Sequence, residues 1–179
     1  MTDSTLFSYG RLAIVFGVLA AVVYSIIVTV TLTRLEAISG LQAFDMRPLG
    51  YDPEQAVVLL EALGEEGRAY YLNRQIILDT FYPALLALAL INAVRWLVSD
   101  QGLGALGRAA ILCAVAVAVF DYSENLGVLM MIQSWPDVPD GVVYASSVAT
   151  ILKSFLTILA VALVLGVAVA SARRRLERG

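Results

Sequence analysis

The sequence has no histidine and a single cysteine, Cys113, among its 179 residues. Imidazole is therefore excluded as a metal ligand, a haem ligand or a general base. One thiol excludes an intrachain disulfide and any Cys-x-x-Cys redox or zinc motif. With no cofactor motif in the chain, we expect no cofactor and no dedicated metal site. The net charge of −3 and the lack of a basic patch argue against nucleic acid as a partner.

Charge of either sign is also scarce, whereas apolar residues are abundant. Only 15% of the residues are charged and 60% are hydrophobic, where soluble domains have about 25% and about 45–50%. The mean hydropathy is +0.82. Disorder requires the opposite composition, low hydrophobicity with high charge. The composition therefore predicts an integral membrane protein, and the length predicts a single domain over residues 1–179.

Four apolar segments are close to or longer than the roughly 20 residues that a helix needs to cross the hydrocarbon core. These predicted spans are residues 12–32, 71–98, 109–132 and 142–172. They predict an all-α fold, a four-helix transmembrane bundle. Arginines gather on one side of these spans, at Arg11, Arg95 and Arg108 and in the tail at Arg173, Arg174, Arg175 and Arg178. Because positive charge in short connections stays in the cytoplasm, we expect a multi-pass protein of the cell (inner or plasma) membrane with both termini cytoplasmic.

The first connection, residues 33–70, is long for a segment without structure of its own. Asp52, Pro53 and Gln55 form the pattern of an N-cap, a first-turn proline and an N3 glutamine, and Gly64 is placed to end the helix that they begin. Its apolar residues share one face: Ala56, Leu59, Leu60 and Leu63. We interpret it as a short amphipathic helix in the first extracytoplasmic loop, either resting on the interface or covering a cavity between the spans.

Ionisable residues inside the spans are the most informative feature, because each costs about 2.5–3.5 kcal/mol to insert. Asp79, Asp121, Glu124 and Lys153 come from three spans, and a rise of about 1.5 Å per residue puts them all roughly 13–18 Å below the outer ends. Tyr24 of the first span reaches the same depth. The spacing therefore predicts one polar layer in the outer half of the bilayer.

Helical phase predicts that these groups face inward. Asp121, Glu124 and Asn125 stand at i, i+3 and i+4, which is one face of a helix. Polar residues also line one face of the second and fourth spans: Gln75, Asp79 and Tyr82, and Ser146, Thr150, Lys153 and Thr157. Since lipid satisfies none of these groups, we expect them to surround a pocket. Two carboxylates one turn apart in such a site disfavour joint ionisation.

We interpret the pocket as the binding or transport site of a small amphiphilic or cationic, lipid-like ligand, with membrane lipids as the other partners. The candidate ligand-binding residues are Asp79, Asp121, Glu124, Asn125, Lys153, Tyr24 and Tyr82, with Tyr122 as a further aromatic wall. No residue is assigned a catalytic role.

Three alternatives fit the same residues. In the first, the polar layer is a buried network that fixes helix register and binds nothing. In the second, it is an enzyme site in which a carboxylate pair acts on a lipid or peptide. The third alternative is a non-catalytic subunit or assembly factor of a larger membrane complex, or a homo-oligomer. Small residues at Ala162, Gly166 and Ala170 are compatible with that packing role.

Overall fold

The computed structural model describes residues 3–99 and 102–177, and within these ranges the chain forms helices and no strand. Arg178, one of the predicted tail arginines, lies outside the described residues. The helices are α1 (Asp3–Ile26), η1 (Ile27–Leu32), α2 (Thr33–Ser39), η2 (Phe44–Met46), α3 (Pro53–Tyr70), η3 (Tyr71–Gln75), α4 (Ile76–Leu97), α5 (Ala105–Gln133) and α6 (Asp140–Leu176). The prediction of an all-α fold is confirmed.

Several of these elements run directly into one another, so that four long helical stretches result. The stretches Ser8–Ser39, Pro53–Leu97, Ala105–Gln133 and Asp140–Leu176 are each long and apolar enough to cross a membrane. Large apolar side chains cover their outside, with Ile14 68% exposed, Leu112 70% and Ile158 73%. A monomeric soluble protein rarely exposes so much contiguous apolar surface. The chain is therefore a multi-pass membrane protein.

Of two predicted helix ends, one is wrong. The first helix does not end before Thr33 but continues through α2 to Ser39, where Gly40 (φ 70°) stops it. The charged residues Arg34 and Glu36 end the apolar run, but they are compatible with helix and only mark where the helix becomes polar. The other prediction is confirmed: Gly64 (φ 61°, ψ −170°) is not helical and ends the helix that begins at Pro53, and a second helical segment follows it and leads through η3 into α4.

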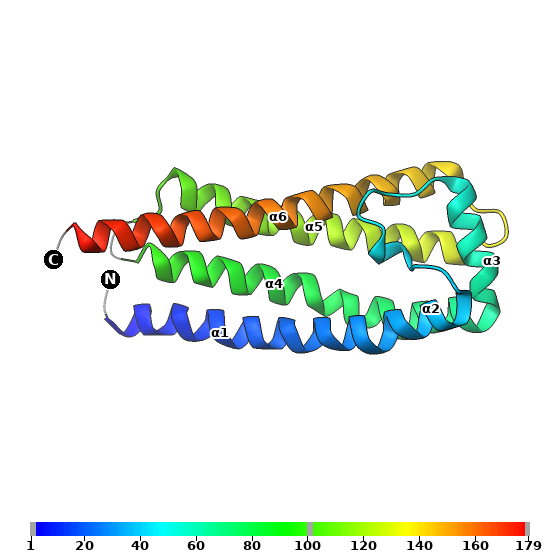
Figure 1. Cartoon of the computed structure of the whole chain (residues 1–179), viewed down its shortest axis with the longest axis horizontal. Helices are drawn as coiled ribbons and strands as arrows, with labels where there is room; N and C mark the ends of the chain where they lie inside the picture. The colour runs from blue at the N-terminus through cyan, green and yellow to red at the C-terminus, as the bar shows by residue number, and fades with distance from the viewer. Residues whose placement is uncertain (1–2, 100–101, 178–179) are drawn as a thin grey trace.

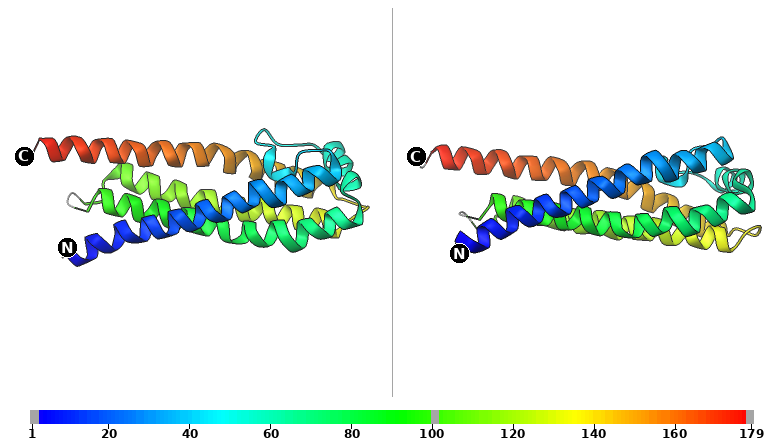
Figure 2. Two further views of the ribbon diagram at one scale, coloured as in Figure 1. Left: turned by 60° about the horizontal axis from the view of Figure 1, so that its bottom comes forward. Right: turned by 90° about the horizontal axis from the view of Figure 1, so that it is seen from below.

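The four long stretches form an elongated bundle in which α1 packs against α4, α4 against α5, and α5 against α6 (Figure 1). α1 begins and α6 ends at the same end of the bundle, which we call the terminal end. Residues 40–70, which we call the cap segment, lie at the opposite end, the cap end. Seen from below, α1 and α6 lie apart at the terminal end and cross in projection on the way to the cap end (Figure 2).

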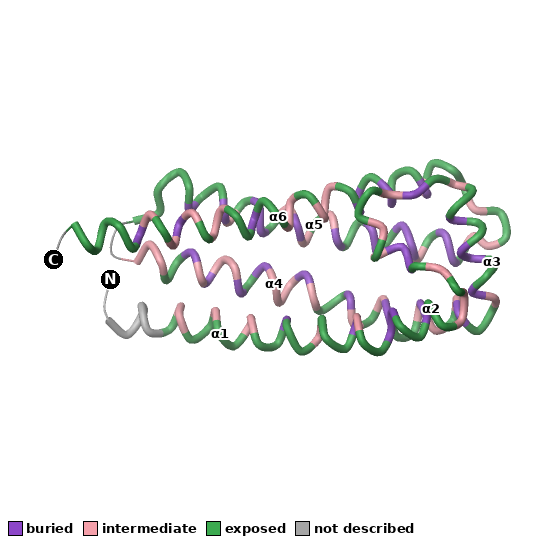
Figure 3. Tube along the Cα trace, in the orientation of Figure 1, coloured by how far each residue is buried: buried purple, intermediate pink, exposed green. Residues whose placement is uncertain are grey.

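The main hydrophobic core lies at the cap end, as the distribution of buried residues in Figure 3 shows. There the cap segment contributes Phe44, Leu59 and Leu60, each at most 1% exposed, against Tyr71 and Met131 of the bundle. The predicted start of α3 is present: Gln55 N donates to Asp52 Oδ1 at 2.8 Å, and Asp52 N donates to Gln55 Oε1 at 3.3 Å. This capping box fixes where α3 begins.

Candidate functional site

The acidic face of α5 is buried against its neighbours. Asp121 is 3% exposed, Glu124 0% and Asn125 7%. Their spacing of i, i+3 and i+4 places all three on the side of α5 that faces α4 and α6, as the helical phase predicts. Side chains of this kind need polar partners where water is excluded. The partners of Asp121 and Glu124 come from the polar face of α6, and that of Asn125 comes from α4.

Lys153 on α6 is the counter-charge of this face. Its Nζ forms an ion pair with Glu124 Oε2 and lies 3.4 Å from Asp121 Oδ1. The lysine side chain is only 14% exposed, so both pairs are largely shielded from solvent. One cation on α6 therefore holds two carboxylates of α5, which fixes the register of the two helices.

The rest of the polar face of α6 completes the contacts of Glu124. Thr150 Oγ1 donates to Glu124 Oε1 at 2.7 Å, and Ser146 Oγ donates to the Glu124 carbonyl oxygen at 3.3 Å. The close approach depends on Gly127, because a Cβ there would lie 2.4 Å from the Ser146 Cβ. Gly127 thus lets α6 come near enough for its side chains to reach Glu124.

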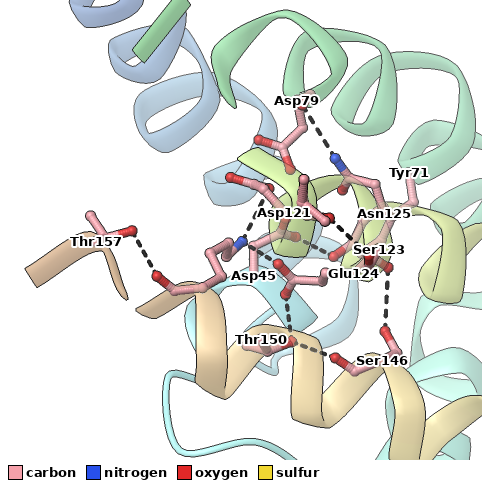
Figure 4. Close-up of polar contacts among 12 residues, drawn as sticks. Asp45, Tyr71, Asp79, Asp121, Ser123, Glu124, Asn125, Ser146, Thr150 and Thr157 are labelled. Atoms are coloured by element: carbon pink, nitrogen blue, oxygen red, sulfur yellow. Dashed lines mark hydrogen bonds and ion pairs between the residues drawn. The ribbon is translucent and has the colours of Figure 1, made fainter. Parts of the chain in front are cut away.

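Asp79 on α4 differs from the other two acids. It is 5% exposed, and its Oδ2 has no hydrogen-bond partner among residues 3–99 and 102–177. Asn125 does not bind this carboxylate but donates from Nδ2 to the Asp79 carbonyl oxygen at 3.2 Å. In Figure 4 the carboxylates of Asp79 and Asp121 point into the same region between the helices. Asp79 is therefore a buried acid whose side chain lacks a matching donor or cation.

A cavity of about 210 Å³ lies in front of these acids and is lined by all four long stretches. Its polar wall contains Asp79, Asp121, Lys153, Ser154 and Thr157, and its apolar wall contains Ile27, Leu32, Leu86 and Val117. Tyr24 and Tyr82 line it as well, with their rings stacked at a centroid distance of 5.2 Å. Asp45 and Met46 of the cap segment complete the lining. The cavity lining therefore combines charged and apolar side chains.

The candidate residues predicted from the sequence are thus divided in two groups. Tyr24, Tyr82, Asp79, Asp121 and Lys153 line the cavity. Glu124 and Asn125 are absent from the lining and lie behind it, where they bind Lys153 and the backbone of α4.

Tyr122, considered as a further wall, is absent from the lining: it is 39% exposed and donates from its hydroxyl to the Thr80 carbonyl oxygen at 2.9 Å.

Asp45 is the residue of this site that sequence reasoning missed. It lies in η2, outside the four predicted spans, and reaches the cavity because its neighbour Phe44 is fully buried at the cap end. Tyr71 donates from its hydroxyl to Asp45 Oδ2. The only local signal was a lone acid between two apolar residues, Phe44 and Met46.

Tyr51 fastens the cap segment to α6. Its backbone N donates to Ser147 Oγ and its hydroxyl donates to Ser146 Oγ, both at 2.8 Å. Burial raises the pKa of the Tyr51 hydroxyl well above its ordinary value, so the group stays a donor at neutral pH. Gly50 (φ 85°) makes the approach feasible, because a Cβ there would lie 2.6 Å from Ser147 Oγ.

The acids of this site are not arranged as a metal centre: within residues 3–99 and 102–177, no three Asp, Glu or Cys side chains form a group that would hold a metal ion. No protein-family description matches this chain, and comparison with curated proteins and with solved structures finds no match either. The chemistry of the site therefore has to be argued from its own residues. Those residues are four carboxylates, from Asp45, Asp79, Asp121 and Glu124, around one lysine.

Proposed function

We propose that this protein binds or moves a small cationic, amphiphilic ligand, lipid-like in character, and that the ligand's cationic group occupies the cavity in front of Asp79. The observation that carries the proposal is the buried Asp79 carboxylate, which lines the cavity and has an unpartnered Oδ2 among the described residues. A carboxylate in that position is costly unless a cation or donor binds it. A ligand with an ammonium group supplies both.

The other charges of the site support this assignment, because they are already engaged. Lys153 is bound by Glu124 and lies against Asp121, and Asp45 accepts a hydrogen bond from Tyr71. Both ion pairs that Lys153 forms with described residues are thus with α5, and Asp79 is not a partner in either. The surplus of negative charge favours a cationic ligand over an anionic one.

The apolar wall and the cavity volume support an amphiphile. Ile27, Leu32, Leu86 and Val117 line the cavity together with the acids, so part of the ligand meets hydrocarbon. About 210 Å³ is less than the roughly 300–1,000 Å³ of pockets that enclose a drug-sized molecule. The cavity therefore suits a head group with the first part of its chain rather than a whole lipid.

We further propose that the protein lies in the cell membrane with both termini in the cytoplasm. The cap segment is then extracytoplasmic, with α3 as a short amphipathic helix, and the cavity lies in the outer half of the bilayer. The arginines at the terminal end, including Arg11, Arg95 and Arg108, support this orientation.

Equilibrium binding of radiolabelled decylamine to the protein in lipid nanodiscs tests the function, with empty nanodiscs to subtract partitioning. We expect saturable binding that Asp79→Asn weakens about 10- to 100-fold, since a hydrogen bond to a charged group contributes about 1.5–3 kcal/mol. Asp137→Asn, an exposed acid in the turn between α5 and α6, is the matched control and should leave affinity unchanged.

Equal binding by the native protein and Asp79→Asn would refute the assignment. No saturable binding, together with altered stability of the variant, would favour the purely structural network.

A further inference from the structure

The cavity is closed toward the cap end. Phe44 and Tyr71 are at most 1% exposed there, and Tyr51 holds the cap segment against α6 through two hydrogen bonds. The largest hydrophobic cluster of the protein lies between the cap segment and the bundle. Access from this side requires the whole cluster to come apart.

The cavity is closed toward the terminal end as well. Val117, Cys113 and Ala160 form a buried cluster between α5 and α6, with Leu86 and Leu90 of α4 packed against it. A second cluster of Val94, Ala110 and Val167 joins the same three helices farther along. These layers leave α4, α5 and α6 tightly packed on the terminal side of the cavity.

The remaining side is the one between α1 and α6. α1 packs against α4, and α6 packs against α5, so α1 and α6 both line the cavity without forming a closely packed pair in the described part of the chain. Tyr24 of α1 and Met46 of the cap segment line the cavity and are 49% and 43% exposed. On the opposite flank, Ser154 and Thr157 of α6 line it and are half-buried. The lining thus reaches the outer surface of the bundle between α1 and α6.

We infer that the cavity opens sideways into the hydrocarbon layer between α1 and α6, and that its ligand is a single-chain alkylammonium amphiphile that arrives from the bilayer. This inference rests on the proposed function. The ammonium group passes Tyr24 and Ser154 to reach Asp79, while the alkyl chain stays between α1 and α6 in contact with lipid. A small water-soluble cation has no aqueous route to the same acids and is excluded.

The opening itself is tested without a ligand, by a nitroxide attached at Ser154→Cys in a Cys113→Ala background. Molecular oxygen concentrates in the bilayer, whereas a nickel chelate stays in water, so the two relaxing agents report which phase reaches the label. Ser123→Cys on the exposed side of α5 and Asp137→Cys in the turn are the lipid and water controls. We expect the Ser154 label to resemble the Ser123 label; relaxation by the nickel chelate as at Asp137, or by neither agent, would overturn a sideways opening.

The ligand class is tested by photo-crosslinking in liposomes, with an alkylammonium that carries a diazirine at the end of its chain. We expect labelling of α1 and α6 beside the cavity, competed by decylammonium and not by methylammonium, and lost in Asp79→Asn. Labelling of residues 40–52, or equal competition by methylammonium, would overturn the route from the bilayer. Absence of any competed labelling, with the Ser154 label still facing lipid, would overturn the proposed function and leave the opening intact.

Discussion

The buried pair of Glu124 and Lys153 offers a direct measure of what holds α5 to α6. Glu124 is 0% exposed and Asp121, one turn away on α5, is 3% exposed. Lys153→Met removes the counter-charge of both acids. Removing one partner of a buried ion pair costs about 3–5 kcal/mol, and we expect this variant to lose that amount of unfolding free energy. Glu124→Gln should lose less, about 1.5–3 kcal/mol, because Asp121 stays 3.4 Å from Lys153 and the new amide still accepts from Thr150.

The double variant separates the pair from its surroundings. If the two side chains stabilise each other, the combined loss should be smaller than the sum of the single losses by about 1–3 kcal/mol. The assay is equilibrium unfolding in mixed micelles, followed by circular dichroism during a titration with dodecyl sulfate. Arg34 and Glu66 are the control pair: they lie 3.3 Å apart with side chains 56% and 81% exposed, and such pairs couple by about 0–1 kcal/mol. Equal coupling in the two cycles would refute the view that Lys153 fixes the register of α5 and α6.

Two further variants test the packing around the site. Gly127→Ala places a methyl group 2.4 Å from the Ser146 Cβ and should lower the unfolding free energy by about 1–3 kcal/mol in the same titration, whereas Gly104→Ala, which meets no atom within 4 Å, should change little. Tyr51→Phe loses the hydroxyl bond to Ser146 and should cost about 1 kcal/mol at neutral pH. Because burial raises the pKa of Tyr51 in the folded state, its stabilising effect is complete below the ordinary tyrosine value of about 10 and declines as the pH rises further. The stability difference between the native protein and Tyr51→Phe should therefore shrink in strongly alkaline titrations, and a constant difference would contradict the burial argument.

The central part of the site was predictable because it depends on regular helix geometry. A fixed rise per residue set the depth of Asp121, Glu124 and Lys153, and a fixed rotation per residue set their faces. The rise and the rotation per residue were enough to predict that the charged faces of α5 and α6 are in contact. Nothing in that reasoning required knowledge of the loops.

The contributions of the cap segment were not predictable, because they arise from contacts distant in sequence. Tyr51 binds α6 across sequence separations of 95 and 96 residues, and Asp45 is placed by the burial of Phe44 rather than by any local pattern. Helical phase also does not decide which acid Lys153 selects. The lysine forms ion pairs with Glu124 and Asp121, whereas the Asp79 side chain lines the cavity with an unpartnered Oδ2 among the described residues. Side-chain reach and packing determine this pairing.

The separation of Lys153 from its acids along the chain has a consequence for biogenesis. Asp121 and its cation lie 32 residues apart, on opposite sides of a short turn, so α5 reaches the translocon before α6 does. A nascent α5 alone would carry two uncompensated acids into the translocon. We therefore expect α5 and α6 to be released into lipid together as a hairpin, in which the lysine of α6 compensates the acids of α5.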